Sequence, residues 1–128
     1  MNVHSTAVVS NGAKLGEYVF VGAHSVIEDR ADLGENTKVG AHVFVGEGVR
    51  VGEGVVVGPG CVLTRDLVVE DRVTLGPGVM TVGRVRIGKK VTVNAGAILI
   101  GPLDVTFNVE PGAIVNAEVA DYLRTVKK

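Results

Sequence analysis

The sequence is poor in the residues that usually build a globular core or a covalent framework. Its 128 residues include no Trp, three Phe, two Tyr and a single Cys. The scarcity of rings argues against a core that takes its bulk from aromatic side chains. One Cys excludes an internal disulfide and a zinc site built from several cysteines.

Charge of one sign and long apolar runs are lacking too. Thirteen basic and fourteen acidic side chains give a net charge of −1, so nothing favours nucleic acid or a membrane surface as a partner. No apolar run approaches the roughly eighteen residues of a membrane span. The opening residues, Met1 to Thr6, show no apolar segment behind a basic start, so we expect no signal peptide and a cytoplasmic location.

What the sequence has in quantity is a repeat of six residues. In steps of six from Val3 to Val105, seventeen of eighteen positions are Val, Leu or Ile, and Thr81 is the exception. The next residue is Gly nine times, and the residue four places after each aliphatic is small or apolar, as at Ser25 and Cys61. A period of six with two inward places per unit fits neither an amphipathic helix nor a plain alternating strand.

Short strands joined by tight turns satisfy this period. Three units make a triangular coil of eighteen residues, and successive coils stack at the strand spacing of about 4.8 Å. Eighteen units predict an all-β fold, a parallel β-helix of about six coils. We expect the first and fifth places of each unit to point inward, and the Gly at the second place to supply the unusual φ of the turns.

The pattern resembles the hexapeptide-repeat family, whose members form left-handed parallel β-helices. The resemblance covers residues 3 to about 108, so we expect a β-helix domain over 1–108 and a C-terminal cap over 109–128. Val109-Glu110-Pro111-Gly112 is expected to break the register. A short helix that caps the last coil or packs on a neighbour is predicted by the helical spacing of Val115, Val119, Leu123 and Val126, with Lys127 and Lys128 at its end.

The sixth place of each unit is expected to point outward, so that every eighteenth residue stacks in one column. One such column, called the apolar strip below, consists of Val8, Val26, Phe44, Val62, Met80 and Ile98. A strip of this length should not face water, and a helix of about ten residues would cover only about half of it. We therefore expect a homo-oligomer packed through this side. A closed trimer is the arrangement that the family resemblance implies.

The turn column beside the apolar strip holds the most suggestive residues. It consists of Thr6, His24, His42, Gly60, Gly78 and Gly96. We predict that His24 and His42 stack on adjacent coils, where imidazoles are suited to proton transfer near neutral pH. The glycines beyond them would leave a groove in which a ligand reaches the backbone. The alternative is a pair of turn histidines without chemistry.

A second turn column is expected to stack Lys90 over Arg72, with Lys89 next to them. Like charges one strand spacing apart repel unless an anion lies between them, and a phosphate is the natural candidate. The alternative is a solvated basic patch.

Three segments are similar to N-acetyltransferases that act on nucleotide-linked amino sugars. They are His4-Ser5-Thr6-Ala7, the stretch from Val73 to Thr81, and the stretch from Arg86 to Gly96. The resemblance implies an acyl-CoA-dependent acyltransferase with active sites between subunits. Its reaction would be acetyl transfer to an amino group of a nucleotide-linked sugar or a similar small-molecule acceptor.

The same resemblance implies acetyl-CoA as co-substrate and no metal. Its pantetheine arm and phosphates would be held by Gly78, Ala95, Gly96, Lys89 and Lys90. We expect His24 or His42 to accept the proton as an amine or hydroxyl attacks the thioester, while a backbone N–H stabilises the oxyanion.

Two other classes of protein remain open. A non-catalytic trimeric scaffold, or a relative that has lost catalysis, would suit the very regular repeats from Leu33 to Pro59. The γ-class carbonic anhydrases share the fold and bind zinc through three histidines at subunit interfaces. This chain has three histidines but no pair five residues apart as in that class, so a metal would need a ligand from a neighbouring chain.

Overall fold

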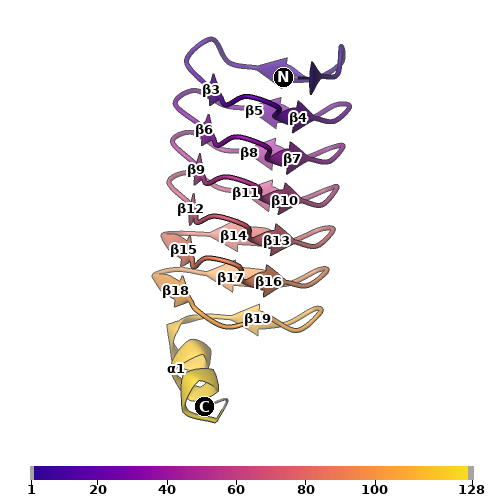
Figure 1. Ribbon diagram of the computed structural model, residues 1–128. Helices are drawn as coiled ribbons and strands as arrows, with labels where there is room; N and C mark the ends of the chain where they lie inside the picture. The colour runs from indigo at the N-terminus through magenta and orange to yellow at the C-terminus, as the bar shows by residue number, and fades with distance from the viewer. Residues whose placement is uncertain (1, 127–128) are drawn as a thin grey trace.

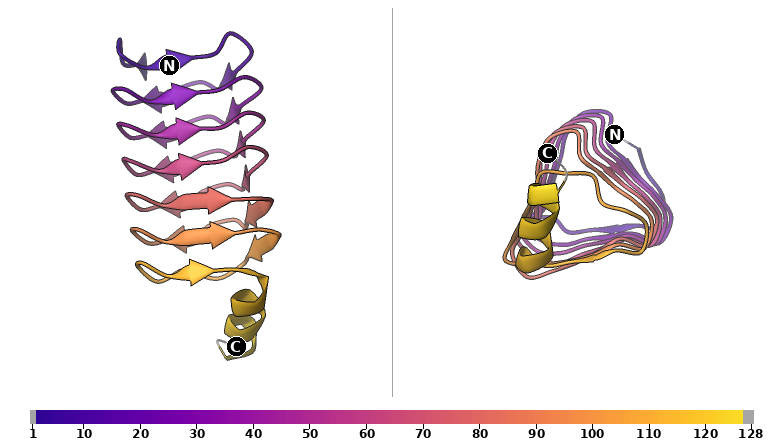
Figure 2. Two further views of the ribbon diagram at one scale, coloured as in Figure 1. Left: turned by 180° about the vertical axis from the view of Figure 1, so that it is seen from behind. Right: turned by 90° about the horizontal axis from the view of Figure 1, so that it is seen from below.

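A computed structural model describes residues 2–126 as three parallel β-sheets wound into one triangular column (Figures 1 and 2). Sheet A contains β1 (Asn2–Val3), β4 (Phe20–Val21), β7 (Lys38–Val39), β10 (Val56–Val57), β13 (Thr74–Leu75) and β16 (Thr92–Val93). Sheet B contains β2 (Val8–Val9), β5 (Val26–Ile27), β8 (Phe44–Val45), β11 (Val62–Leu63), β14 (Met80–Val82), β17 (Ile98–Ile100) and β19 (Ile114–Val115). Sheet C contains β3 (Lys14–Leu15), β6 (Asp32–Leu33), β9 (Arg50–Val51), β12 (Val68–Val69), β15 (Val85–Ile87) and β18 (Leu103–Val105).

The pairing register is the one that the repeat predicts. Val26 pairs with Phe44 and Phe44 with Val62, so residues eighteen apart are neighbours on adjacent coils. The prediction of an all-β, left-handed parallel β-helix with a short C-terminal helix is confirmed.

Both inward places of the unit are buried as expected. The first place supplies fully buried aliphatics such as Ile27, Leu63 and Leu99. The fifth place supplies small residues, among them Ser25, whose hydroxyl donates to the Gly40 carbonyl at 2.7 Å and accepts the Val43 N–H at 3.0 Å. Within residues 2–126, every buried side-chain nitrogen and oxygen has a hydrogen-bond partner. The narrow interior therefore accounts for the scarcity of aromatics.

The expectation about the repeat glycines is wrong. The positive φ of the turns falls at the fourth place, where eight residues other than Gly adopt it, including Tyr18 (62°), His24 (59°) and His42 (57°). Glycine at the second place instead permits close stacking of backbones. A Cβ built on Gly34 would lie 2.6 Å from the carbonyl carbon of Gly52 in the next coil.

The last coil is shorter than the others. Val93 bridges Val109 and Ile98 pairs with Ile114, a spacing of sixteen residues, because the turn after Val105 is two residues shorter than the turn after Ile87. β19 joins sheet B, so the strand pairing continues past residue 108, where the sequence predicted that the β-helix ends.

The helix α1 (Ala117–Val126) lies at the end of the column (Figure 1). Asn116 caps it by accepting the Val119 N–H at 2.9 Å, and Ala120 is buried against the last coil. The helix contacts β18 and β19 and leaves the apolar strip uncovered, with Val8, Phe44 and Met80 exposed at 62, 37 and 38%. Lys127 and Lys128 lie outside the described residues. In the described part of the chain, no helix is long and apolar enough to cross a bilayer.

Candidate functional site

The corner between sheets A and B, called the histidine corner, carries the two predicted catalytic residues. The His24 and His42 rings stack with their centroids 5.1 Å apart and their planes inclined by 23°. Both residues take the left-handed conformation, and the His42 N–H donates to the Ala23 carbonyl at 2.9 Å. The predicted stack on adjacent coils is therefore present, and both side chains are exposed.

A short chain of hydrogen bonds anchors this stack at the first coil. The His24 N–H donates to Thr6 Oγ1 at 2.9 Å. The Thr6 N–H donates to His4 Nδ1 at 3.2 Å, and this nitrogen lies 2.9 Å from Thr6 Oγ1. Because Nδ1 accepts from the backbone, the Thr6 hydroxyl is assigned as a second donor to it. The Nδ1 atom of His4 is therefore occupied by hydrogen bonds within its own turn.

Beyond His42 the corner loses its side chains. Gly60, Gly78, Gly96 and Gly112 follow in the same column with φ between 69° and 73°. In the described structure no atom outside the adjacent residues lies within 4 Å of a Cβ built on Gly60 or Gly78. The glycines leave a strip of turn backbone without side chains, called the glycine groove after the groove that the sequence predicts, that begins at His42 and runs along the later coils.

The backbone of the glycine groove offers few free donors. The N–H groups of Gly60, Gly78 and Gly96 donate to the preceding coil at 3.0, 2.9 and 2.9 Å. Within residues 2–126, the N–H groups of Ala41 and Ala95 donate no hydrogen bond. The free N–H of Ala41 lies directly before His42, and the free N–H of Ala95 lies directly before Gly96, at the far end of the glycine groove.

The structure does not bring all five predicted cofactor residues together. Gly78, Ala95 and Gly96 lie at the histidine corner, whereas Lys89 and Lys90 lie in the turn between sheets C and A, called the lysine corner. Sheet A separates the two groups. The lysine corner is also the corner opposite sheet B, and hence opposite the apolar strip (Figure 2).

At the lysine corner the predicted stacking of cations is present. Arg72 and Lys90 occupy the same turn position on adjacent coils with φ of 60° and 63°. Together with Lys89 they line a cavity of about 280 Å³, whose other walls are Glu53 and Asp71. Asp71 Oδ1 accepts the Glu53 N–H at 2.9 Å. Three cations against two carboxylates leave the cavity net positive, which suits an anion.

Cys61 lies beneath the histidine corner and is no candidate nucleophile. Its thiol is buried and donates to the Gly76 carbonyl at 3.1 Å, and burial raises its pKa. A raised pKa keeps the sulfur protonated near neutral pH.

A metal centre within one subunit finds no support. Among residues 2–126, no group of three or more His, Cys, Asp and Glu side chains is placed to hold a metal ion. His4 Nδ1 is taken by Thr6, which leaves the stacked pair as the remaining imidazoles.

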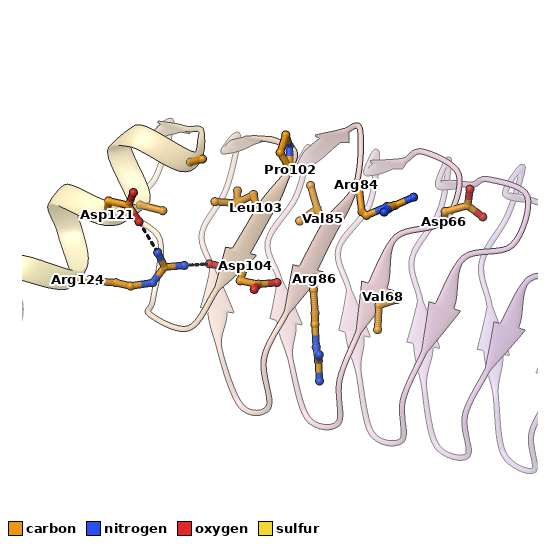
Figure 3. Close-up of a pocket in the computed structure, with 12 residues that line it drawn as sticks. Asp66, Val68, Arg84, Val85, Arg86, Pro102, Leu103, Asp104, Asp121 and Arg124 are labelled. Carbon is orange, nitrogen blue, oxygen red and sulfur yellow. Dashed lines mark hydrogen bonds and ion pairs between the residues drawn. The ribbon is translucent and has the colours of Figure 1, made fainter.

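The sequence did not predict a cavity of about 520 Å³ that opens between α1 and sheet C (Figure 3). Arg124 reaches across it to the Asp104 carbonyl and pairs with Asp121 at 2.9 Å. Arg86 pairs with Glu70 outside it. None of the predicted site residues lines this cavity. The sequence predicted a break of the register at 109–112 and a short helix after it, but not the cavity that α1 forms with sheet C.

A second missed cavity borders the apolar strip. It has a volume of about 400 Å³ and is lined by Phe44, Gly46, Thr64 and a charged wall. In that wall Glu47 pairs with Arg65 at 2.9 Å, and Arg30 reaches the same carboxylate oxygen at 2.9 Å. The acidic neighbours Glu28 and Asp29 complete it.

Comparison with known proteins identifies the repeat and the fold. The family described as bacterial transferase hexapeptide (six repeats) matches residues 30–65. Among curated proteins, no sequence match was found.

Solved structures resemble nearly the whole chain. The acetyltransferase domain of PglB from Neisseria gonorrhoeae FA1090 has a TM-score of 0.76 at 16% identity, over 92% of this chain and 55% of that one. PerB from Caulobacter crescentus, in complex with CoA and GDP-perosamine, has a TM-score of 0.70 at 19% identity, over 89% of this chain and 51% of that one. WeeI from Acinetobacter baumannii AYE has a TM-score of 0.52 at 21% identity, over 88% of this chain and 51% of that one.

This chain spans about half the length of each of these structures, and identities this low show a shared fold. The resemblance that the sequence predicts is thereby confirmed: residues 30–65 carry hexapeptide repeats of the bacterial transferase kind, in a β-helix like those of these structures, one of which is an acetyltransferase domain.

Proposed function

We propose that this chain is an acyl-CoA-dependent acyltransferase that moves an acetyl group to an amino group of a small acceptor, such as a nucleotide-linked sugar. The observation that carries the proposal is the histidine corner, where two stacked imidazoles stand at the head of the glycine groove. The structure of the PglB acetyltransferase domain in complex with acetyl coenzyme A, with a TM-score of 0.74, supports the choice of donor.

The reaction needs a base, an oxyanion donor and a place for the thioester. As the acceptor nitrogen bonds to the thioester carbonyl carbon, its proton passes to His24 or His42. The Ala41 N–H, which is free beside His42, supports the carbonyl oxygen as it becomes negative. Collapse of the tetrahedral intermediate breaks the carbon–sulfur bond, and the imidazolium returns its proton to the CoA thiolate.

The proposed position of acetyl-CoA is based on the spacing of the coils. From His42 to Gly96 is three coil steps, about 14 Å, which a pantetheine arm in the glycine groove would span. The Ala95 N–H is free to donate to an amide carbonyl of that arm. The rest of the molecule would cross the outer face of sheet A beside Thr92 and place its phosphates at Lys89 and Lys90.

The acceptor site requires a second subunit in this proposal. The histidine corner is one edge of sheet B, whose outer face is the apolar strip. A homotrimer packed through the strip would bring a neighbouring chain alongside the histidine corner and close the groove. The lysine corner, opposite the strip, would stay open to solvent.

Thermal unfolding with and without acetyl-CoA tests the proposal first. Ligand at ten times its Kd stabilises the folded state by about 1.4 kcal/mol, so up to about 1 mM acetyl-CoA should raise the Tm by several degrees. Inorganic phosphate at the same concentration is the control and should not reproduce the shift. A Tm that acetyl-CoA leaves unchanged contradicts the proposal.

A non-catalytic trimeric scaffold is the second candidate. One observation favours it, because neither His24 nor His42 lines the cavity of about 520 Å³ between α1 and sheet C. A scaffold would keep the apolar strip and its assembly but bind no CoA thioester, so the same thermal measurement separates the two.

A further inference from the structure

We infer that the two histidines have different roles: His42 is the general base, and His24 is a positioning residue that holds the His42 ring by stacking on it. The inference rests on the proposed acyltransferase function. It assigns to one residue the proton transfer that the sequence left open between His24 and His42. It follows from two differences in the surroundings of the two rings and from one feature that they share.

The first difference is access to the glycine groove. His24 lies between two side chains of its column, Thr6 on one coil and His42 on the next. His42 has His24 on one side only. On its other side lies Gly60, where no atom of the described structure outside the adjacent residues lies within 4 Å of a built Cβ. A substrate in the glycine groove therefore meets the His42 ring first.

The shared feature concerns the nitrogen atoms, which in the described structure are free in both rings. Stacking uses the face of a ring and leaves the in-plane lone pairs free. Within residues 2–126, no hydrogen bond involves a ring nitrogen of His24 or His42, whereas His4 Nδ1 is taken by Thr6. His42 is thus held in place while its nitrogen remains available for a proton, as a general base requires.

The second difference is the partner of the backbone. The His24 N–H donates to the side chain of Thr6, which is itself held by His4, whereas the His42 N–H donates to the Ala23 carbonyl. In the described structure each histidine side chain has the other ring as its partner. Without that ring, an exposed imidazole rotates about two side-chain torsions and spends less time aimed at the groove.

Three variants test the division of roles by acetyl transfer, measured as thiol release from acetyl-CoA. His42→Phe should lose at least about 100-fold in kcat, the scale of a removed general base. His24→Ala should lose about 10-fold or more through misplacement of His42. His24→Phe restores a stacking ring without a proton site, so it should recover most of what His24→Ala loses.

Two results overturn the inference. If His24→Phe is as inactive as His42→Phe, His24 is the base. If His24→Ala retains the parental kcat and pH profile, the stack positions nothing.

NMR of the histidine ring protons separates this inference from the proposed function. The ring-current shift of the His42 protons should be retained in His24→Phe and lost in His24→Ala, because only the phenyl ring keeps the stack. Absence of turnover with every acceptor removes both the proposed function and the base assignment. An unchanged His42 signal in both His24 variants removes the positioning role by itself.

Discussion

At the residue scale, glycine does two separate jobs in this chain, and the positions can be told apart by mutation. Gly34→Ala should destabilise the fold by about 2 kcal/mol or more, because its Cβ would meet the Gly52 backbone at 2.6 Å and neither coil can move aside. Gly54, at the fourth place, has φ of 64° and a nearest atom at 3.6 Å, on the flexible side chain of Arg72. Urea unfolding of Gly34→Ala and of a variant at Gly54 measures the difference in stability.

The matched control is Gly54→Asn. Asn36 already adopts a φ of 61° one coil earlier in the same column, so Asn at 54 should change stability by less than about 1 kcal/mol. Equal losses in Gly34→Ala and Gly54→Asn would show that backbone conformation, not coil contact, limits both sites.

The sequence alone could not make this distinction. The repeat correctly predicted which residues point inward, because burial follows the period directly. It assigned the positive φ to the commonest glycines, although residues as large as Tyr18 and Arg72 bear it here. A glycine marks either an unusual φ or a close backbone approach, and only the stacked coils show which.

At the scale of elements, Glu70 fastens the turn that follows β12 to the next coil, at β15 and the turn that follows it. Its carboxylate accepts from Arg86 Nε at 3.0 Å and from the Lys89 N–H at 3.2 Å, and its side chain is 25% exposed. The bond from Arg86 lowers the pKa of Glu70, with smaller contributions from the Arg86 charge and the Lys89 N–H. A carboxyl with a lowered pKa in the folded state stabilises the fold above its ordinary pKa, and that contribution is lost as the pH falls through the lowered value.

Glu70→Gln should therefore lower the free energy of unfolding at pH 7. The difference from the parent chain should shrink as the pH drops below about 4.3, the ordinary range of a Glu carboxyl. Glu35→Gln, at another turn of the same corner, is the control and should show no comparable pH dependence. Chemical unfolding from pH 7 to pH 3 measures both. A Glu70→Gln deficit that is equally large at pH 3 would show that the charge is not what fastens this turn.

The arrangement of the strands also explains why the sequence did not predict the candidate site in full. Lys89 and Lys90 lie within seven residues of Ala95 and Gly96 along the chain, and the sequence grouped them as one cofactor site. The strand β16 between them carries the chain along a whole side of the triangle, so they occupy different corners. The His24–His42 stack was predictable because residues eighteen apart superpose whatever the corner.

At the scale of the whole molecule, the uncovered apolar strip is the feature that a single chain leaves unexplained. The strip continues onto Ile114 of β19, which is 60% exposed, and α1 does not reach across it. Sheet C, by contrast, carries Lys14, Asp32 and Arg50 at the same outward place. This difference between faces favours one sheet as the interface between copies.

Phe44→Glu places a charge in the middle of that strip and should dissociate the assembly. The parent chain is expected to sediment at about three times its 13.3 kDa mass, and the variant at the mass of one chain. Val56→Glu is the control, because Val56 is also outward and 43% exposed but lies on sheet A, so its charge should leave the assembly intact. A parent chain that sediments as a monomer contradicts the trimer directly. If Val56→Glu dissociates the assembly and Phe44→Glu leaves it intact, the interface lies on sheet A. The histidine corner borders both sheets, so it would then contact the neighbouring chain from the side of sheet A.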